Sequence, residues 1–351
     1  MEYFLLFLLL VLPILLSVIR SKRRRKPGNL PPGPAGLPLI GIFHQVVATP
    51  LHEYFCQLSK EYGPLMYLKL GSRPVLVATS SRTAEEILKT QDLAFCSRPA
   101  MLSLRKLSYE GFDIAFAPYS EYWREMRKVC VLHLLSATRV RSFRPIREDE
   151  ASRLVQQLSE LAARAETINM NEHITFFTST IISRVAFGKR YEHGSGESKA
   201  FYQIIREFQG MMSGFFFTDY FPWLGWLDKV LGKIDELERV YKKWDLFYQE
   251  LLDEHLRPDR PKSMDGDVVD ILLQLRKDGS FDLPLNHIKA VLMNVYFAST
   301  DTIATTVIWA LTALIKNPSA LKKKEDIDTD ISPGLTMHKK NPLFLVAKKF
   351  V

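Results

Sequence analysis

Asp301 and Thr302 are the residues whose types and spacing could most directly do chemistry in this sequence. They stand in the run "FASTDTIATT", residues 297–306, and no other charged residue lies between Lys289 and Lys316. A carboxyl group beside a hydroxyl group can pass protons to a reacting centre, so the pair predicts a proton relay. The alternative is structural, because Ser and Thr hydroxyls in helices often bond the carbonyl one turn earlier.

The element that must position this pair is a long helix predicted over residues 285–316, with Asn286 as its cap and Pro318 at its end. At 1.5 Å per residue it would be ~48 Å long. A second transmembrane span is one alternative, because the stretch is apolar. An Asp at mid-bilayer costs ~3 kcal/mol, so a helix through the centre of a folded protein fits better. Its polar residues are Asn294, Ser299, Thr300, Asp301, Thr302, Thr305, Thr306 and Thr312.

The rest of the chain predicts a mainly α fold with a small N-terminal β-sheet. Two β-rich runs, residues 65–70 and 74–79, flank "GSR" and predict a hairpin. Apolar periodicity between Gly and Pro breaks predicts a series of helices. Their ranges are 52–62, 81–90, 119–131, 145–165, 171–187, 198–215, 231–256 and 266–277.

The N-terminal residues predict a membrane anchor. Residues 4–19 are apolar except at Pro13 and Ser17, and a basic run follows at residues 20–26. A membrane-spanning helix needs ~20 apolar residues. A cleaved secretory signal, the alternative, carries its charge before the apolar run and a small-residue cleavage site after it. We therefore expect an uncleaved signal anchor at residues 1–20, with the basic side and the bulk of the chain in the cytosol.

A basic and Pro-rich hinge is predicted at residues 21–40. Its prolines cannot join a helix, and such segments run stiff and extended. It is either a generic linker or a rigid spacer that holds the folded domain at a fixed angle to the membrane. The formal net charge is +8, but most of the excess lies in this basic run beside the anchor. The rest of the chain has no clustered basic groove, which argues against a nucleic-acid partner.

The three cysteines, Cys56, Cys96 and Cys130, are widely spaced and form no CxxC pair. They predict no disulfide framework and fit a reducing compartment. Each is expected to be a small buried hydrophobe rather than a ligand.

Several segments in order carry a resemblance to a known family. They are "PPGP" after the basic run, "AFCSRP" at residues 94–99, "FAPYSEYWREMRKVCVLHLLS" at residues 116–136, and "FASTDT" in the long helix. This order resembles the microsomal cytochrome P450s, and their plant A-type branch in particular, over residues 1 to about 323. The resemblance implies a haem-dependent monooxygenase that inserts oxygen into a small apolar substrate. It also implies electrons from NADPH–cytochrome P450 reductase and a single-pass anchor in the endoplasmic reticulum membrane.

The resemblance assigns roles to five residues. Trp123 and Arg127 match the W-x-x-x-R motif whose side chains bind a haem propionate in the family, and Arg98 is similar to a second propionate-binding Arg. An Arg fork and an indole N–H both suit a carboxylate. Asp301 and Thr302 match the acid–alcohol pair that delivers protons to iron-bound dioxygen. Surface charge or cation–π packing is the alternative for the first three residues.

The sequence also departs from the family pattern. Ser299 replaces a Gly that opens an oxygen groove, and the family's F-x-x-G-x-R-x-C-x-G loop, which supplies the thiolate ligand of the iron, is absent. Residues 330–347 resemble the family's extreme C-terminus, with a final strand at residues 342–347. The two ends of a P450 thus look joined near Lys323, which predicts a partial P450-like domain at residues 41–323 and a C-terminal tail at residues 324–351.

Such a join implies a splice variant, a pseudogene or a faulty gene model. The chain as written is then expected to bind no Cys-ligated haem and to be inactive. The alternative class is a membrane-anchored non-enzymatic or unstable product. Apolar residues of the long helix, such as Val295, Ile303 and Trp309, are expected to lose part of their cover.

Overall fold

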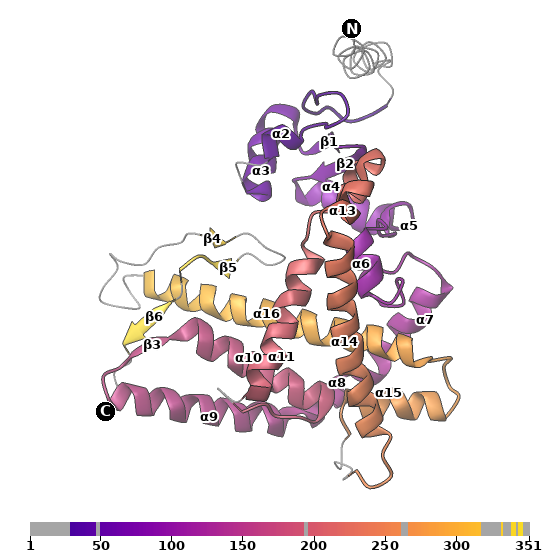
Figure 1. The fold of residues 1–351 in the computed structure, drawn as a ribbon. Helices are drawn as coiled ribbons and strands as arrows, with labels where there is room; N and C mark the ends of the chain where they lie inside the picture. Colours follow the sequence, from indigo (N-terminus) through magenta and orange to yellow (C-terminus); the bar gives the residue numbers. More distant parts are fainter. Residues whose placement is uncertain are drawn as a thin grey trace. The chain divides into compact units, whose positions relative to one another are not determined.

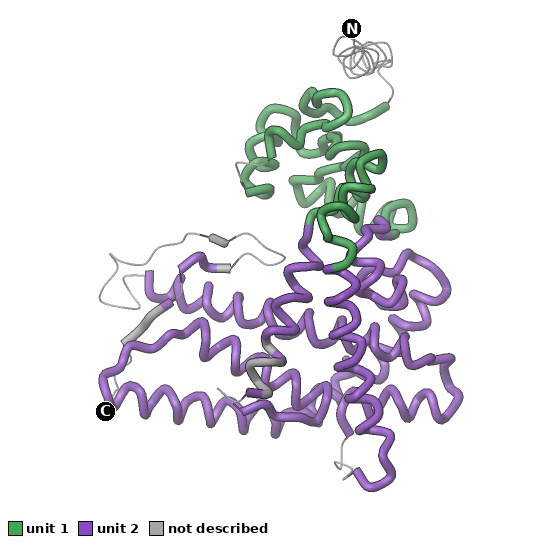
Figure 2. Tube along the Cα trace, in the orientation of Figure 1, with its two compact units in different colours: residues 1–97, 215–235 green, residues 98–214, 236–351 purple. Residues whose placement is uncertain are grey.

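The structure is a computed structural model that falls into two compact units, which are described separately (Figures 1 and 2). Unit 1 comprises residues 1–97 and 215–235, and unit 2 comprises residues 98–214 and 236–351. The described residues are 29–46, 50–192, 196–260, 266–316, 331–332, 338–341 and 343–346. The predicted anchor at residues 1–20, the first part of the hinge, Pro318 and the predicted join near Lys323 lie outside them.

Unit 1 contains the predicted hairpin. Strands β1 (Leu65–Leu70) and β2 (Arg73–Ala78) are antiparallel, with Leu65 opposite Ala78. The helices of this unit are α2 (Phe43–Val46), α3 (Leu51–Tyr62), α4 (Ser81–Glu85), the π-helical turn η1 (Glu86–Thr90), α5 (Asp92–Phe95), α12 (Phe217–Tyr220), the 3₁₀ turn η3 (Pro222–Leu224) and α13 (Trp226–Val230). Ser80 caps α4 through the backbone N–H of Thr83, as the Ser/Thr-rich start predicts.

The end of the Pro-rich hinge is packed against this hairpin. The Tyr67 N–H of β1 donates to the Pro32 carbonyl at 3.0 Å. Gly33 lies so close to the same strand that an added Cβ would be 1.8 Å from the Tyr67 carbonyl oxygen. Only glycine fits there, so residues 32–33 are a docked segment and not a free linker.

Unit 2 is built from helices. They are α6 (Leu102–Leu107), α7 (Glu121–Val129), the π-helical turn η2 (Cys130–Leu134), α8 (Ala137–Ser142), α9 (Arg144–Ala163), α10 (Met170–Phe187), α11 (Gly196–Met212), α14 (Lys233–His255), α15 (Val268–Lys277) and α16 (Leu285–Lys316). Figure 1 shows α9, α10 and α16 lying side by side, and α10 packs against both of its neighbours. The predicted fold class, mainly α with a small N-terminal sheet, is confirmed.

Short strands complete unit 2. Strand β3 (Thr167–Asn169) pairs antiparallel with β6 (Phe344–Val346), and β4 (Ile331–Ser332) pairs with β5 (His338–Lys339). The final strand predicted at residues 342–347 is therefore present over its central part. Its partner β3 was not predicted, because three residues carry too little alternation to be read as a strand.

Helix α16 is the predicted long helix and forms much of the core. Its N-terminal half contributes buried aromatic and aliphatic side chains, and its C-terminal half packs Ala304 and Ile308 against Ile168 and Ile174. The predicted cap is wrong: the helix begins at Leu285, and the Pro284 carbonyl accepts its first hydrogen bonds, so Asn286 lies inside the first turn.

Among the described residues, α16 is also the helix long and apolar enough to cross a membrane, and 22% of its most apolar window is buried. The same helix is a core element of unit 2, which argues for the predicted central helix over a second span.

Candidate functional site

The predicted proton-relay pair, Asp301 and Thr302, lies on the less covered side of α16. Thr302 is exposed and Asp301 is half-buried. The Thr302 hydroxyl donates to the carbonyl of Ala298, one turn earlier, at 2.5 Å. A hydroxyl that donates in this way keeps its lone pairs for accepting a further hydrogen bond. Thr302 Oγ1 can therefore accept from a water or ligand on the open side of the helix.

The other threonines of α16 are mostly structural. Thr300 and Thr312 are buried, and each donates to the carbonyl four residues earlier at 2.8 Å. Thr306 makes the same bond to the Thr302 carbonyl at 2.7 Å. Thr300, Thr306 and Thr312 thus make the hydrogen bond to the preceding turn that the structural alternative expects. Helix α16 is continuous through Ser299, where the family pattern has Gly.

Helix α7 places Trp123 and Arg127 one turn apart. Ser120 caps the helix by accepting from the backbone N–H of Trp123 at 3.2 Å. The Arg127 guanidinium lies 5.4 Å from the centre of the Trp123 ring, a cation–π contact. Within the part of the chain that the structure describes, no carboxylate pairs with Arg127, and its side chain is exposed. Its fork therefore remains available for an anion.

Arg98 and Trp123 are tied to neighbouring carbonyls of one loop. The Trp123 indole N–H donates to the Ile114 carbonyl at 3.0 Å. The Arg98 Nε–H donates to the Ala115 carbonyl at 3.1 Å. The structure thus brings these two predicted residues together around residues 114–115. It places Asp301 and Thr302 on a different element, α16.

Two functional candidates were missed by sequence reasoning. Asp113 and Asn294 join the same loop to α16 through a buried hydrogen bond of 2.9 Å between Asn294 Nδ2 and Asp113 Oδ2. Asn294 lies two helical turns before Asp301. The only local signals were an amide inside the apolar run "AVLMNVYF" and an Asp followed by a turn, and neither reveals its partner.

The described residues fit a haem in part. Exposed guanidinium groups at Arg98 and Arg127 suit its propionates. The iron ligand does not fit: Cys130 is 2% exposed, and burial raises the pKa of its thiol to about 12. Without a metal, a thiol of that kind stays protonated near neutral pH. The expectation that each cysteine is a small buried hydrophobe is wrong for the other two, because Cys56 is exposed and Cys96 is half-buried.

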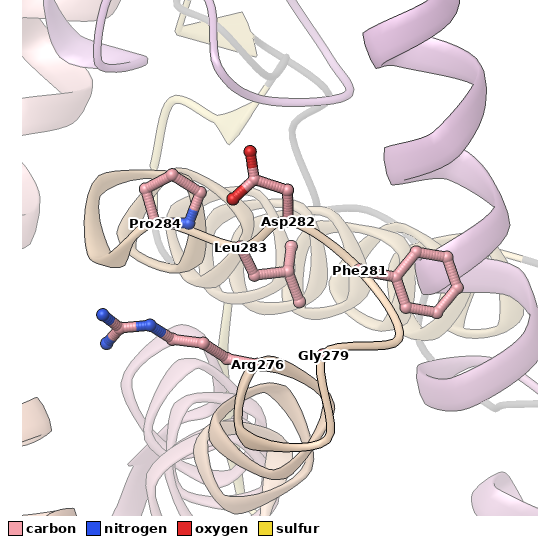
Figure 3. Close-up of a pocket in the computed structure, with 6 residues that line it drawn as sticks. All are labelled: Arg276, Gly279, Phe281, Asp282, Leu283 and Pro284. Atoms are coloured by element: carbon pink, nitrogen blue, oxygen red, sulfur yellow. The ribbon is translucent and has the colours of Figure 1, made fainter.

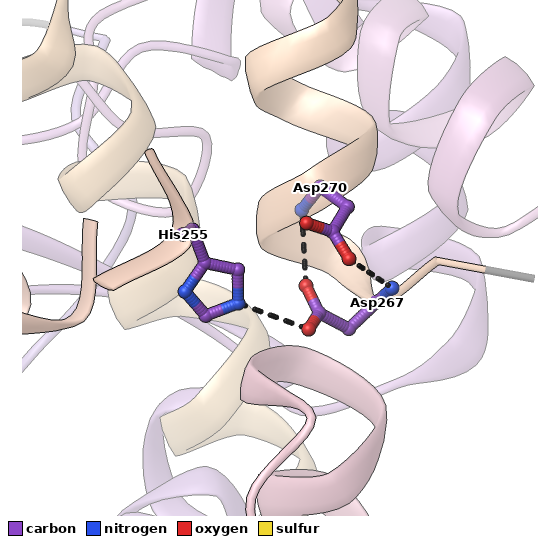
Figure 4. Close-up of side chains that lie close together, drawn as sticks. All are labelled: His255, Asp267 and Asp270. Atoms are coloured by element: carbon purple, nitrogen blue, oxygen red, sulfur yellow. Dashed lines mark hydrogen bonds and ion pairs between the residues drawn. The ribbon is translucent and has the colours of Figure 1, made fainter. Parts of the chain in front are cut away.

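A second cluster of polar side chains resembles a metal site but is internally satisfied. His255, Asp267 and Asp270 have ligand atoms within 4.8 Å of one another (Figure 4). Asp267 and Asp270 form the capping box of α15, and His255 Nε2 lies 3.0 Å from Asp267 Oδ2. Arg260 donates to both carboxylates, at 2.8 and 2.6 Å. The carboxylate oxygens that a metal would need are thus already bonded to the Arg260 guanidinium, to His255 and to the backbone N–H groups of the capping box.

A pocket lies at the start of α16, away from the predicted site. It has a volume of ≈ 540 Å³ and is lined by Arg276, Gly279, Phe281, Asp282, Leu283 and Pro284 (Figure 3). These residues form the end of α15 and the loop that follows. Asp301 is sixteen residues beyond Leu285, or ~24 Å along the helix, so this pocket does not belong to the acid–alcohol pair.

Comparisons with known proteins agree with the resemblance. The family model described as "Cytochrome P450" matches residues 31–340. Among curated proteins, "Xanthotoxol synthase" of Pastinaca sativa is 46% identical over 325 residues, which are 92% of this chain and 64% of that protein. "5-OH-xanthotoxin synthase" of Ammi majus is 43% identical over 93% of this chain and 65% of its own length. "Cytochrome P450 71A9" of Glycine max is 39% identical over 95% of this chain and 68% of its own length. The chain spans slightly less than two thirds of the length of the first two.

Proposed function

The chain belongs to the cytochrome P450 family, in its plant branch, and we propose that it carries the distal and propionate-binding part of a haem monooxygenase site. The reaction of that lineage is oxygen insertion into a small apolar substrate. The observation that carries the proposal is the side of α16 with exposed Ala298 and Thr302, where a hydroxyl beside an acid can still accept a hydrogen bond.

In this proposal the chain's own residues hold the edge of the cofactor and handle protons. When bound, haem supplies the iron at which oxygen is activated. Arg98 and Arg127 neutralise its propionates, and Trp123 supports Arg127 through its ring. Thr302 Oγ1 would keep its proton in the bond to the Ala298 carbonyl and accept a hydrogen bond from a water on the open side of α16, with Asp301 as the neighbouring acid.

The named relatives suggest the chemistry of the substrate. "Xanthotoxol synthase", "6,7,8-trihydroxycoumarin synthase" and "5-OH-xanthotoxin synthase" each make a product whose name carries a hydroxyl. We therefore place the substrate of this chain's lineage among small, planar aromatic compounds of the coumarin type. NADPH–cytochrome P450 reductase is the proposed electron donor, and the proposed location is the endoplasmic reticulum membrane, with residues 1–20 as the anchor and residues 21–40 as the hinge.

The chain as written is proposed to be inactive. None of its three cysteines lies in the family's ligand motif, and the one in unit 2, Cys130, is buried as a neutral thiol. The proposed organisation is a partial P450 domain at residues 41–323 joined to the family's C-terminal tail at residues 324–351. Strand β6 in the tail, paired with β3, supports the reading of that tail as a folded part of the family architecture.

A second candidate function is a membrane-anchored protein without enzymatic activity, or an unstable product. The observation in its favour is the open side of α16, where Ile303 is 50% exposed. Transcript sequencing across the codons for Lys323 and Lys324 separates the two candidates. A longer reading frame with the cysteine loop supports the enzyme, and a genuine short transcript supports the second candidate.

The propionate assignment is tested with Arg127→Gln in the full chain, titrated with haem in detergent. We expect the apparent haem affinity to fall by about tenfold, because a charge-assisted pair is lost. The matched control is Arg124→Gln, an exposed Arg of the same helix that pairs with Glu121 at 3.2 Å. Equal affinities of both variants and of the wild type, or no haem binding by the wild type, would contradict the assignment.

A further inference from the structure

The loop of residues 108–118 is joined to α16 by a pair of buried side chains. Asp113 is fully buried, and its Oδ1 accepts from the backbone N–H groups of Phe116 and Ala117 at 3.0 and 2.9 Å. Asn294, on α16, donates from Nδ2 to the other oxygen of Asp113 at 2.9 Å. We call these two side chains the Asp113–Asn294 clamp.

The amide oxygen of Asn294 holds the middle of the loop. Its Oδ1 accepts from the backbone N–H groups of Ile114 and Ala115 at 2.9 and 3.2 Å. Four consecutive loop N–H groups, at residues 114–117, therefore bond to the clamp. The clamp leaves no buried donor in this stretch unpaired, which matters because an unpaired buried amide costs ~1–3 kcal/mol.

Ile114 and Ala115, whose N–H groups bond to Asn294, also accept hydrogen bonds from two residues of the candidate site. The Ile114 carbonyl accepts the Trp123 indole N–H, and the Ala115 carbonyl accepts the Arg98 Nε–H. Residues 114–115 thus bond to Asn294 through their N–H groups and to Trp123 and Arg98 through their carbonyls. The Asn294 amide is thus connected to both carbonyl acceptors through one short backbone segment.

The loop is held in a conformation that it would not adopt alone. Tyr109, Glu110 and Gly111 all have positive φ angles, of 55°, 65° and 88°. Two of the three are not glycine, and a bulky residue with positive φ is strained. The Tyr109 ring packs against the ring of Tyr241 in α14, with 5.5 Å between the ring centres. Strained backbone at residues 109–111 persists only if the surrounding structure fixes the loop. The hydrogen bonds of the clamp to residues 114–117 fix it.

We propose that Asn294 is a positioning residue that sets the orientation of Arg98 and Trp123 through residues 114 and 115. The proposal rests on the proposed function, in which Arg98 and the Trp123–Arg127 pair hold the propionate edge of the haem. Asn is suited to this position because one side chain must both accept from the loop and donate to Asp113. Asp at the same position would place two carboxylates together.

The test exchanges the two side chains of the clamp. Asn294→Asp places two carboxylates face to face, and Asp113→Asn places two amides face to face. The double variant D113N/N294D restores the bond between the two side chains and their bonds to the loop N–H groups, with the roles exchanged. Thr300→Val is the control, because Thr300 is buried in the same helix and bonds only its own helix backbone. All variants are made in the full chain and purified in detergent, and near-UV circular dichroism selects those that fold.

Two measurements report on positioning without haem. One is hydrogen exchange of the amides at residues 114–117, and the other is the indole N–H signal of Trp123, assigned by its loss in Trp123→Phe. We expect each single variant to raise amide exchange by about tenfold or more and to shift the indole signal. The double variant should return both to wild-type values, and Thr300→Val should change neither.

Haem titration of the same proteins then separates the two proposals. A loss of haem affinity in the single variants, recovered in the double variant, supports positioning for the cofactor. If the wild type binds no haem while exchange follows the expected pattern, the proposed function fails and the clamp stands. Unchanged exchange and indole signals in folded Asn294→Asp, or no recovery in the folded double variant, would overturn the proposal.

Discussion

At the scale of single residues, the chemistry depends on which side of an element each group faces. Thr302 and Thr306 make the same backbone bond as Thr300 and Thr312, yet only the first two are exposed. Trp123 was expected to donate its indole N–H to a propionate, and the structure has that N–H on the Ile114 carbonyl instead. Its ring, stacked with Arg127, is the part that can serve an anion site.

The state of Cys130 gives a prediction at this scale. Burial raises the pKa of its thiol to about 12, so at pH 8 only about one molecule in 10⁴ carries the thiolate. We expect iodoacetamide to label exposed Cys56 at pH 8 and to leave Cys130 unlabelled in the folded full chain. Peptide mass spectrometry measures both sites. Comparable labelling of the two in folded protein would show that Cys130 is not held as described.

Asp113 gives a prediction about pH. Burial raises the pKa of this carboxyl above its ordinary value of 3.8, although bonds from Asn294, Phe116 and Ala117 oppose the shift. A raised pKa contributes stability that is fully present below the unfolded pKa and is lost as pH rises through the folded one. The free energy of unfolding of the wild type, relative to Asp113→Asn, should therefore fall as pH rises above about 4. A difference that stays level or grows over pH 4–7 contradicts this.

At the scale of elements, sequence periodicity located most helices, because Gly and Pro breaks bound apolar repeats clearly. The long helix, predicted at residues 285–316, is α16 at those bounds, and 145–165 is α9 (Arg144–Ala163). The clamp could not be predicted, because Asp113 and Asn294 are 181 residues apart and neither has a local pattern that names the other. Strand β3 could not be predicted for the same reason, because its partner β6 lies far away in the sequence, in the C-terminal tail.

The two sides of α16 give a prediction at this scale. Ile308 is 3% exposed in the core, whereas Ile303 is 50% exposed. Ile308→Ala should lower the free energy of unfolding by ~2–5 kcal/mol, and Ile303→Ala by less than about 1 kcal/mol. Denaturant unfolding of both variants measures the contrast. Equal costs would mean that another segment or a ligand covers Ile303 in solution.

At the scale of the whole molecule, the family is evident from the order of motifs, whereas the proposed inactivity rests on the cysteine-ligand motif, which we do not find in this sequence. The match covers residues 31–340, yet this chain spans 64% of its Pastinaca sativa relative. Ile303, which we expected to be poorly covered, is 50% exposed on the open side of α16. Val295 and Trp309, for which we expected the same exposure, are half-buried.

The central claim is that this chain carries the distal part of a P450 site without its thiolate ligand. The most direct measurement is the absorption spectrum of the full chain, expressed with haem supply, reduced and treated with carbon monoxide. The account predicts no thiolate-type Soret band, because none of the three cysteines lies in the family's ligand motif and Cys130 is buried. A thiolate-type band like that of intact P450s would contradict it.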